Sequence, residues 1–162
     1  MYQGEALGLP EAMEIPDEFR QDPTWFRTEG ERYGRDGCRV PLPWSGTAPS
    51  YGFNDTGASW LPQPAEWAEY ARAREDGSDT STLALYRELL RLRKERGLGS
   101  GSLVWEDLGS DAVAFRRGEL HIAANLGSAP LALPSGATVL VHSAPDAGTV
   151  LPPDSAAWYT RG

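Results

Sequence analysis

The chain has 162 residues and a formal net charge of −8. This acidic balance argues against binding to nucleic acid or to an anionic membrane, and no apolar run is long enough to span a bilayer. The single cysteine, Cys38, cannot form an internal disulfide, and no spacing of Cys and His indicates zinc. We therefore expect neither a bound metal nor a cofactor.

The first half of the chain, residues 1–78, has little periodic pattern and is rich in proline, glycine and aromatic side chains. So many aromatic residues are not typical of a disordered segment. They fit a long, irregular segment that lies against a larger body. Only short helical turns are predicted here, over residues 10–15 and 64–74.

Residues 34–44 read Gly-Arg-Asp-Gly-Cys-Arg-Val-Pro-Leu-Pro-Trp. This density of Gly and Pro fits neither a helix nor a central strand, so it predicts an ordered loop of the kind that carries binding groups. Arg35 and Arg39 can donate forked hydrogen bonds, and Asp36 can accept them. Trp44 offers a flat apolar face, which together with these polar groups suits a sugar ring. The same residues also fit a structural salt bridge beside a buried tryptophan.

The clearest regular element is an amphipathic helix over residues 79–96, with Ser78 or Asp79 as its cap and Gly97 after its end. The basic side chains of its last turns are interpreted as a solvated helix end.

Short apolar runs separated by turn residues follow this helix and predict an antiparallel β-sandwich. A tight hairpin is predicted at residues 116–119. His121 and His142 lie in such runs and are expected to be structural. The expected strands are residues 103–108, 112–116, 120–126, 131–133, 138–141 and 156–159.

The loop 34–44 resembles the segment G-R-D-x-x-R-T-P-M-Q-W that follows the catalytic barrel in alpha-glucosidases and oligo-1,6-glucosidases of the alpha-amylase superfamily, glycoside hydrolase family 13. The chain departs from that pattern at Val40, Leu42 and Pro43. Further resemblances, in the order the family has them, lie at Tyr2-Gln3-Gly4-Glu5, at Gln21-Asp22-Pro23-Thr24-Trp25 (an actinobacterial type), at Trp60-Leu61-Pro62-Gln63-Pro64 and at residues 85–94.

The resemblance implies an α+β fragment. Residues 1–98 would be the end of a (β/α)₈ barrel, loops plus the last helix, and residues 99–162 an all-β C-terminal domain. A complete barrel needs roughly 250 residues. In the family, the catalytic carboxylates precede the Y-Q-G-E run, so they would lie before this chain. Met1 stands where the family usually has an apolar strand residue, so we expect a misplaced start codon, a truncated gene or a designed fragment.

The resemblance also implies which residues bind substrate. Arg39 would reach the sugar in subsite −1, and Asp36 would contact substrate or orient an arginine. Glu5 corresponds to the first glutamate of Y-Q-G-E-E, while Ala6 replaces the second. Trp44 and Phe53 could line the entrance, although core packing is the expectation for both. No residue of the chain is expected to be catalytic.

The resulting hypothesis is the C-terminal part of an exo-acting, retaining alpha-glucosidase for malto- or isomalto-oligosaccharides, inactive by itself. Its partners would be the alpha-glucoside oligosaccharide and the missing N-terminal barrel. No basic segment followed by an apolar stretch begins the chain, so we expect no signal peptide, although with an internal start this says little about the parent protein. We expect a cytoplasmic location. The alternative is a stand-alone, non-catalytic β-sandwich module for carbohydrate binding or protein interaction.

Overall fold

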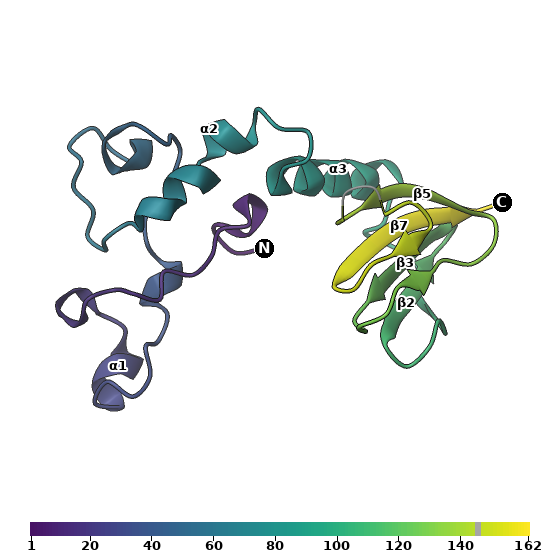
Figure 1. Cartoon of the computed structure of the whole chain (residues 1–162), viewed down its shortest axis with the longest axis horizontal. Coiled ribbons are helices and arrows are strands. Elements are labelled where there is room, and N and C mark those ends of the chain that lie inside the picture. The colour runs from purple at the N-terminus through teal and green to yellow at the C-terminus, as the bar shows by residue number, and fades with distance from the viewer. Residues whose placement is uncertain (145–146) are drawn as a thin grey trace. The chain divides into compact units, whose positions relative to one another are not determined.

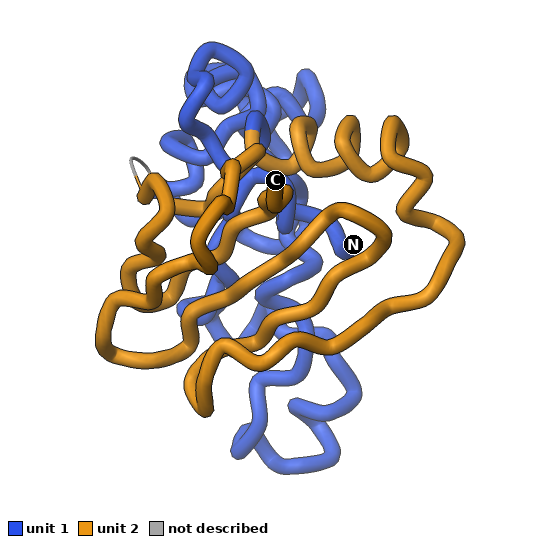
Figure 2. The backbone as a smooth tube through the Cα atoms, turned by 90° about the vertical axis from the view of Figure 1, so that its right-hand side faces the viewer, with its two compact units in different colours: residues 1–84 blue, residues 85–162 orange. Residues whose placement is uncertain are grey.

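The computed structural model describes residues 1–144 and 147–162 (Figure 1). The chain divides into two compact units, residues 1–84 and residues 85–162 (Figure 2). The division falls inside helix α3, Thr82–Glu95. Within the described residues, no helix is both long enough and apolar enough to cross a membrane.

The first unit is built from short helical turns joined by ordered loops. Two short helical elements, η5 and α2, cover most of residues 64–74, as predicted. The prediction of a helical turn over residues 10–15 is wrong. Proline at both ends limits helix formation there, and the Ala12 N–H donates to the Gly37 carbonyl, 3.1 Å away, instead of to a helical carbonyl. The elements are η1 Glu5–Leu7, η2 Asp17–Phe19, α1 Pro23–Arg27, η3 Asp36–Cys38, η4 Pro49–Gly52, η5 Ala65–Tyr70 and α2 Arg72–Glu75.

Long-range contacts replace regular secondary structure in this unit. Its apolar core contains Val40, Leu61 and Trp67 together with Ala12 and Ile15. The loop predicted at residues 34–44 is ordered from both sides. The backbone N–H groups of residues 72 and 73 donate to the carbonyls of residues 43 and 44, each at 3.0 Å, and the side-chain amide of residue 63 donates to the carbonyl of residue 41.

Helix α3 begins later than the sequence predicts. Ser81, rather than Ser78 or Asp79, is its cap, because the Ser81 hydroxyl accepts the Ala84 N–H at 3.1 Å. Gly97 follows the end of the helix with a φ of +61°, as expected for a C-terminal glycine.

The described residues of the second unit form two antiparallel sheets. The larger sheet has the strand order β1-β2-β3-β7-β5, and the smaller one pairs β4 with β6. The hairpin predicted at residues 116–119 is present: Arg117 pairs with Leu120, and Gly118 turns the chain with a φ of +60°. The strands are β1 Val104–Glu106, β2 Ala112–Arg117, β3 Leu120–Asn125, β4 Leu131–Ala132, β5 Ala137–His142, β6 Val150–Leu151 and β7 Ser155–Arg161.

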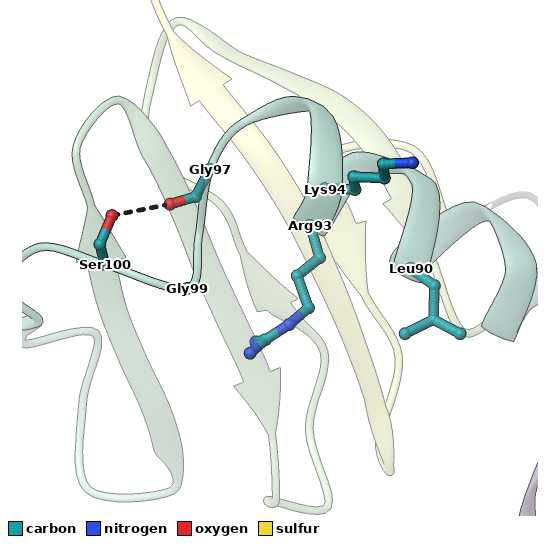
Figure 3. A pocket seen from close by; sticks show the side chains of 6 residues that line it. All are labelled: Leu90, Arg93, Lys94, Gly97, Gly99 and Ser100. Carbon is teal, nitrogen blue, oxygen red and sulfur yellow. Dashed lines mark hydrogen bonds between the residues drawn. The ribbon is translucent and has the colours of Figure 1, made fainter.

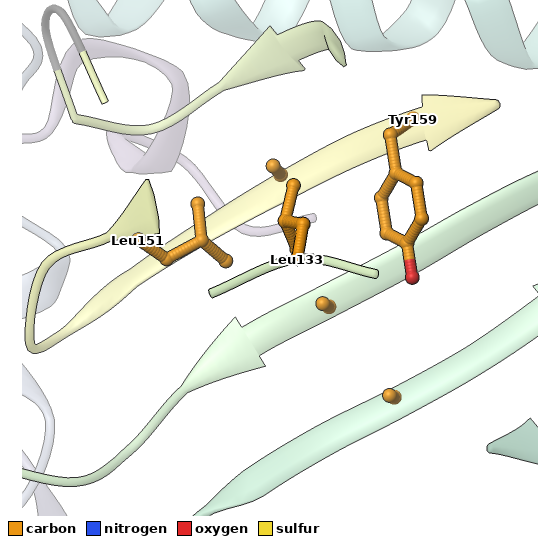
Figure 4. Packing of buried hydrophobic residues seen from close by; sticks show 6 residues of the cluster. Leu133, Leu151 and Tyr159 are labelled. Atoms are coloured by element: carbon orange, nitrogen blue, oxygen red, sulfur yellow. The ribbon is translucent and has the colours of Figure 1, made fainter. Parts of the chain in front are cut away.

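The core of this unit lies on one face of the larger sheet. Leu151 from β6 and Leu133, just after β4, join Tyr159 of β7 in a single buried cluster (Figure 4). Alanines of β2, β3 and β7 complete the cluster, and small side chains at these positions leave room for the leucines.

The opposite face of the larger sheet carries an apolar row that crosses all five strands. Trp105 pairs with Phe115, Phe115 with Ile122, Ile122 with Trp158, and Trp158 with Val141. Side chains alternate along a strand, so this row points away from the buried cluster. Trp105 is 70% exposed, and the other four side chains are half-buried.

Candidate functional site

Asp36 lies beneath the predicted loop rather than on its surface. Its side chain is 1% exposed, and its Oδ2 accepts the backbone N–H groups of Gln21 at 2.8 Å and Asp22 at 2.9 Å. A buried carboxylate that accepts two main-chain donors fixes the position of that main chain. Asp36 therefore ties the loop to residues 21–22, and it does so without an exposed oxygen to offer a ligand.

Asp22 is the second carboxylate of the cluster. Its Oδ1 accepts the Thr24 N–H at 2.8 Å and so caps helix α1, while its Oδ2 accepts the Arg35 N–H at 3.1 Å. The same Oδ2 accepts Nη1 of Arg39 at 2.9 Å. Hydrogen bonds from Thr24, then the Arg35 N–H and the Arg39 charge, hold the pKa of Asp22 at about 2, below its usual 3.8.

Two glycines of the loop allow its backbone to lie close to Asp22 and to Ala12. A Cβ on Gly34 would lie 2.5 Å from Asp22 Cγ, and the residue has a φ of +74°. A Cβ on Gly37 would lie 2.5 Å from the Ala12 carbonyl oxygen. The Gly-Arg-Asp-Gly pattern is thus required by the packing of three chain segments against one another.

Arg39 is the half-exposed cation of this cluster. Its side chain is 38% exposed, and Asp36 Oδ1 lies 4.0 Å from the nitrogen that Asp22 holds. Among residues 1–144 and 147–162, the guanidinium group has no acceptor other than these two aspartates. These donors remain available for a ligand. Arg35 contributes its backbone N–H to the cluster, and its side chain is exposed.

Glu5 lies on a separate side of the loop. It belongs to η1, and the preceding Gln3 donates from Nε2 to the carbonyl of Cys38 at 2.9 Å. Glu5, Cys38 and Trp67 are among the residues that line a pocket of about 170 Å³. Arg39 does not line this pocket, so the structure brings Asp36 and Arg39 together and leaves Glu5 apart.

The two aromatic candidates do not pack as expected. Trp44 is 46% exposed and Phe53 is 51% exposed. The expectation that both are core residues is therefore wrong for this chain, because the loop backbone is held by hydrogen bonds of its neighbours rather than by burial of these rings.

The two histidines lie on strands of the larger sheet. Nδ1 of His121 lies 2.8 Å from Glu106 Oε2, and the ring stacks on Tyr159. The ring of His142 is half-buried on β5. Among the described residues, no group of three or more His, Cys, Asp or Glu side chains could hold a metal ion.

An open hollow of about 520 Å³ lies at the end of α3 (Figure 3). It is lined by Leu90, Arg93, Lys94 and the turn that follows, where the Ser100 hydroxyl donates to the Gly97 carbonyl. The cations stand at the negative end of a helix dipole. We interpret the hollow as that helix end and assign no ligand to it.

Sequence reasoning missed the role of Asp22. The Asp-Pro pair at residues 22–23 is a recognisable helix start, with proline in the first helical position. Its contact with Arg39, 17 residues later, has no local signature in the sequence.

Comparison with known proteins shows two family matches. Residues 1–101 match the model of the alpha amylase catalytic domain, and residues 97–158 match a domain of unknown function (DUF3459). These matches confirm the resemblance derived from the motifs. They also confirm the predicted fold class, an end piece of a barrel domain followed by an all-β domain.

Individual relatives agree with these matches. A probable alpha-glucosidase of Rhizobium meliloti is 35% identical over 118 residues, which are 72% of this chain and 21% of that protein. Maltase A1 of Drosophila melanogaster is 27% identical over 135 residues, 78% of this chain and 23% of that protein. The chain thus spans about a fifth of the length of these curated relatives.

Solved structures cover the whole chain. The alpha-glucosyl transfer enzyme XgtA superposes with a TM-score of 0.79 and 34% identity, over 100% of this chain and 32% of that one. The trehalulose synthase MutB superposes with a TM-score of 0.78 and 26% identity, over 100% of this chain and 35% of that one.

Proposed function

Since this chain belongs to the alpha-amylase family of glycoside hydrolases, we propose that it is the C-terminal part of an exo-acting, retaining alpha-glucosidase. Its substrates would be alpha-glucosidic bonds in malto- or isomalto-oligosaccharides. One observation carries the proposal: the loop that matches the catalytic domain holds a half-exposed Arg39 by one nitrogen, and its other donors remain for sugar hydroxyls.

A retaining glycosidase needs two carboxyl groups roughly 5 Å apart across the scissile bond. The two neighbouring carboxylates of this site, Asp22 and Asp36, are buried and accept backbone N–H groups. They are therefore unsuited to act as nucleophile and acid. We propose that both catalytic groups belong to the part of the enzyme that precedes this chain, and that the 162 residues alone are inactive.

Within this scheme, Arg39 donates hydrogen bonds to the sugar in subsite −1, and Asp36 keeps the loop in place beneath it. Glu5, beside the small pocket, is the second substrate-binding candidate. Trp44 and Phe53, both about half exposed, would line the entrance.

The proposed partner of this chain is the remainder of the catalytic barrel. Exposed aromatic side chains of the first unit, Tyr2, Phe26 and Trp60 among them, support this proposal because such groups normally become buried against another surface. For location we propose the cytoplasm, where an unpaired cysteine such as Cys38 stays reduced. Cell fractionation checks the location.

The decisive experiment is to identify the natural polypeptide that contains this sequence. An antibody to the chain should detect one band well above 17.6 kDa, and that polypeptide should release glucose from an aryl alpha-glucoside. Replacing Arg39→Met should lower kcat/KM by about 10- to 100-fold, the effect of losing a charged hydrogen-bond donor. Arg32→Met, an exposed control on the same unit, should leave it unchanged.

Two results would contradict the proposal. The first is release of glucose by the purified 162-residue chain. The second is a natural band at 17.6 kDa, which would favour the stand-alone β-sandwich module. Oligosaccharide binding by that short form would then separate a carbohydrate-binding module from a protein-interaction module.

A further inference from the structure

We propose that Asp22 is a positioning residue for Arg39: it holds one nitrogen of the guanidinium group so that the remaining donors face a ligand. The part of this proposal that concerns a sugar ligand rests on the proposed function. The part that concerns the orientation of Arg39 stands on the geometry of this chain alone.

The contact distances single out Asp22 among the two carboxylates near Arg39. Asp22 Oδ2 accepts Arg39 Nη1 at 2.9 Å, within hydrogen-bond distance. Asp36 Oδ1 lies 4.0 Å from the same nitrogen and makes no hydrogen bond to it. A hydrogen bond is directional, whereas a charge at 4.0 Å is not, so Asp22 rather than Asp36 restrains the orientation of the guanidinium group.

Asp22 can hold a partner because it is itself immobilised. Its side chain accepts two backbone N–H groups, from Thr24 and Arg35, in addition to Arg39. Its own backbone N–H donates to Asp36 Oδ2. A Cβ on Gly34 would collide with its carboxyl group, so the absence of one lets the loop close over it. Asp36 thus fixes Asp22, and Asp22 fixes Arg39.

Holding Arg39 through Asp22 has a physical advantage for ligand binding. A free arginine side chain samples many rotamers, and a ligand must pay for ordering them. A guanidinium group already held at one nitrogen has lost much of that freedom before the ligand arrives. The remaining N–H groups are then presented in the fixed fork that suits adjacent hydroxyl or carboxylate oxygens.

A purely structural role for Asp22 makes a different prediction. If Asp22 only capped helix α1, asparagine would replace it with little effect, because Asn and Asp cap helices about equally well. Asparagine lacks the negative charge that Arg39 requires. The substitution Asp22→Asn therefore keeps the cap and removes the oxygen that accepts both the Arg35 N–H and Arg39 Nη1. Unchanged hydrogen exchange at the Arg35 N–H then shows that a faster reaction at Arg39 does not come from a loosened loop.

The test uses the purified 162-residue chain and no sugar. Phenylglyoxal modifies accessible arginines, and peptide mapping by mass spectrometry follows the rate at Arg39. We expect Asp22→Asn to raise that rate by about three- to tenfold, since a charge-assisted hydrogen bond no longer protects the group. Asp17→Asn, which removes an exposed partner of Arg20, is the matched control and should change nothing at Arg39.

The unmodified protein provides a second measurement in case Asp22→Asn fails to fold. Arg39 should react several times more slowly than the exposed Arg35 of the same loop, and the difference should vanish in denaturant. Equal rates in the native chain, or an unchanged Arg39 rate in folded Asp22→Asn, would overturn the proposal. Because no sugar is present, either result is independent of whether the alpha-glucosidase proposal holds.

Discussion

The carboxylate of Asp36 illustrates how a motif residue can serve the loop that carries it. The sequence motif places Asp36 beside two arginines, which suggests a structural salt bridge or a residue that contacts a sugar. In the structure it is buried and accepts the N–H groups of Gln21 and Asp22. The residue with free donors is Arg39, and the residue that holds Arg39 is Asp22. The family resemblance indicated the loop that carries these residues, and the hydrogen bonds of the structure show what each residue contacts.

Removing the Asp36 carboxylate should expose the main chain that it fixes. In Asp36→Ala, the part-buried N–H of Gln21 and the buried N–H of Asp22 lose their acceptor, and an unpaired buried donor costs about 1–3 kcal/mol. We expect amide hydrogen exchange at these two residues to accelerate about tenfold or more. Asp55→Ala, at an exposed position of the same unit, should leave both rates unchanged. Unchanged exchange rates of the two amides in Asp36→Ala would show that the hydrogen bonds to Asp36 do not hold this main chain in place.

The titration of Asp22 gives a pH prediction. Its pKa is about 2 in the folded chain and 3.8 in the absence of these contacts. A depressed folded-state pKa contributes stability above the unfolded value, and this contribution is lost as the pH falls through the folded value. We therefore expect the first unit to lose stability between about pH 4 and pH 2.

The carboxyl ¹³C shift of Asp22 in an NMR titration measures this directly. Its midpoint should lie near the folded-state value, and Asp22→Asn should remove the corresponding part of the pH dependence of unfolding. A midpoint at the ordinary aspartate value would argue against the contacts with Thr24 and Arg39.

At the scale of elements, the β-sandwich depends on one very short strand. The two-residue strand β6 places Leu151 in the core, and Asn125 of β3 secures it by donating from Nδ2 to the Leu151 carbonyl at 3.0 Å. The same amide group donates to the Ala129 carbonyl, and its Oδ1 accepts the Gly127 N–H. One buried side chain therefore joins a turn, a central strand and the smaller sheet.

Truncating the core leucine should weaken the second unit. Leu151 is fully buried, so Leu151→Ala should lower the free energy of unfolding by about 2–5 kcal/mol through lost contacts and a cavity. Urea unfolding, followed by far-UV circular dichroism of the β-structure, measures the change in the free energy of unfolding. The control is Leu126→Ala, at a position that is 63% exposed and should cost little. Equal effects of the two substitutions would contradict the described core.

At the scale of the whole molecule, apolar surface is unusually accessible on both units. The first unit exposes several aromatic rings, and the second carries the apolar row headed by Trp105. Burial of these patches against another protein is what the proposed partner, the rest of the catalytic barrel, would provide. This agrees with a chain that spans about a fifth of its curated relatives.

The chain alone should therefore bind a hydrophobic dye strongly. We expect intense fluorescence from anilinonaphthalene sulfonate at neutral pH, and Trp105→Ser together with Phe115→Ser should reduce it. Val113→Ser, two residues before Phe115 on the same face of β2, is a control that removes no aromatic surface. A soluble monomer with no dye binding would contradict the partner proposed for this chain.

The sequence by itself determined the irregular first half, the amphipathic helix, the hairpin at residues 116–119 and most of the strands. Each of these depends on local spacing, turn residues or periodicity, which the chain displays directly. The sequence analysis missed β6, whose two residues directly precede the turn residues Pro152 and Pro153. It also misplaced a helical turn at residues 10–15, where the Ala12 N–H donates to the carbonyl of Gly37 instead.

Only the tertiary structure decided the roles within the loop. The pairing of Asp22 with Arg39, the burial of Asp36 and the exposure of Trp44 all depend on which segments, distant in sequence, come to lie side by side. The order β3-β7-β5 in the sheet has the same origin. Periodicity shows which face of an element is apolar. Which other segment packs against that face depends on contacts between residues far apart in the sequence.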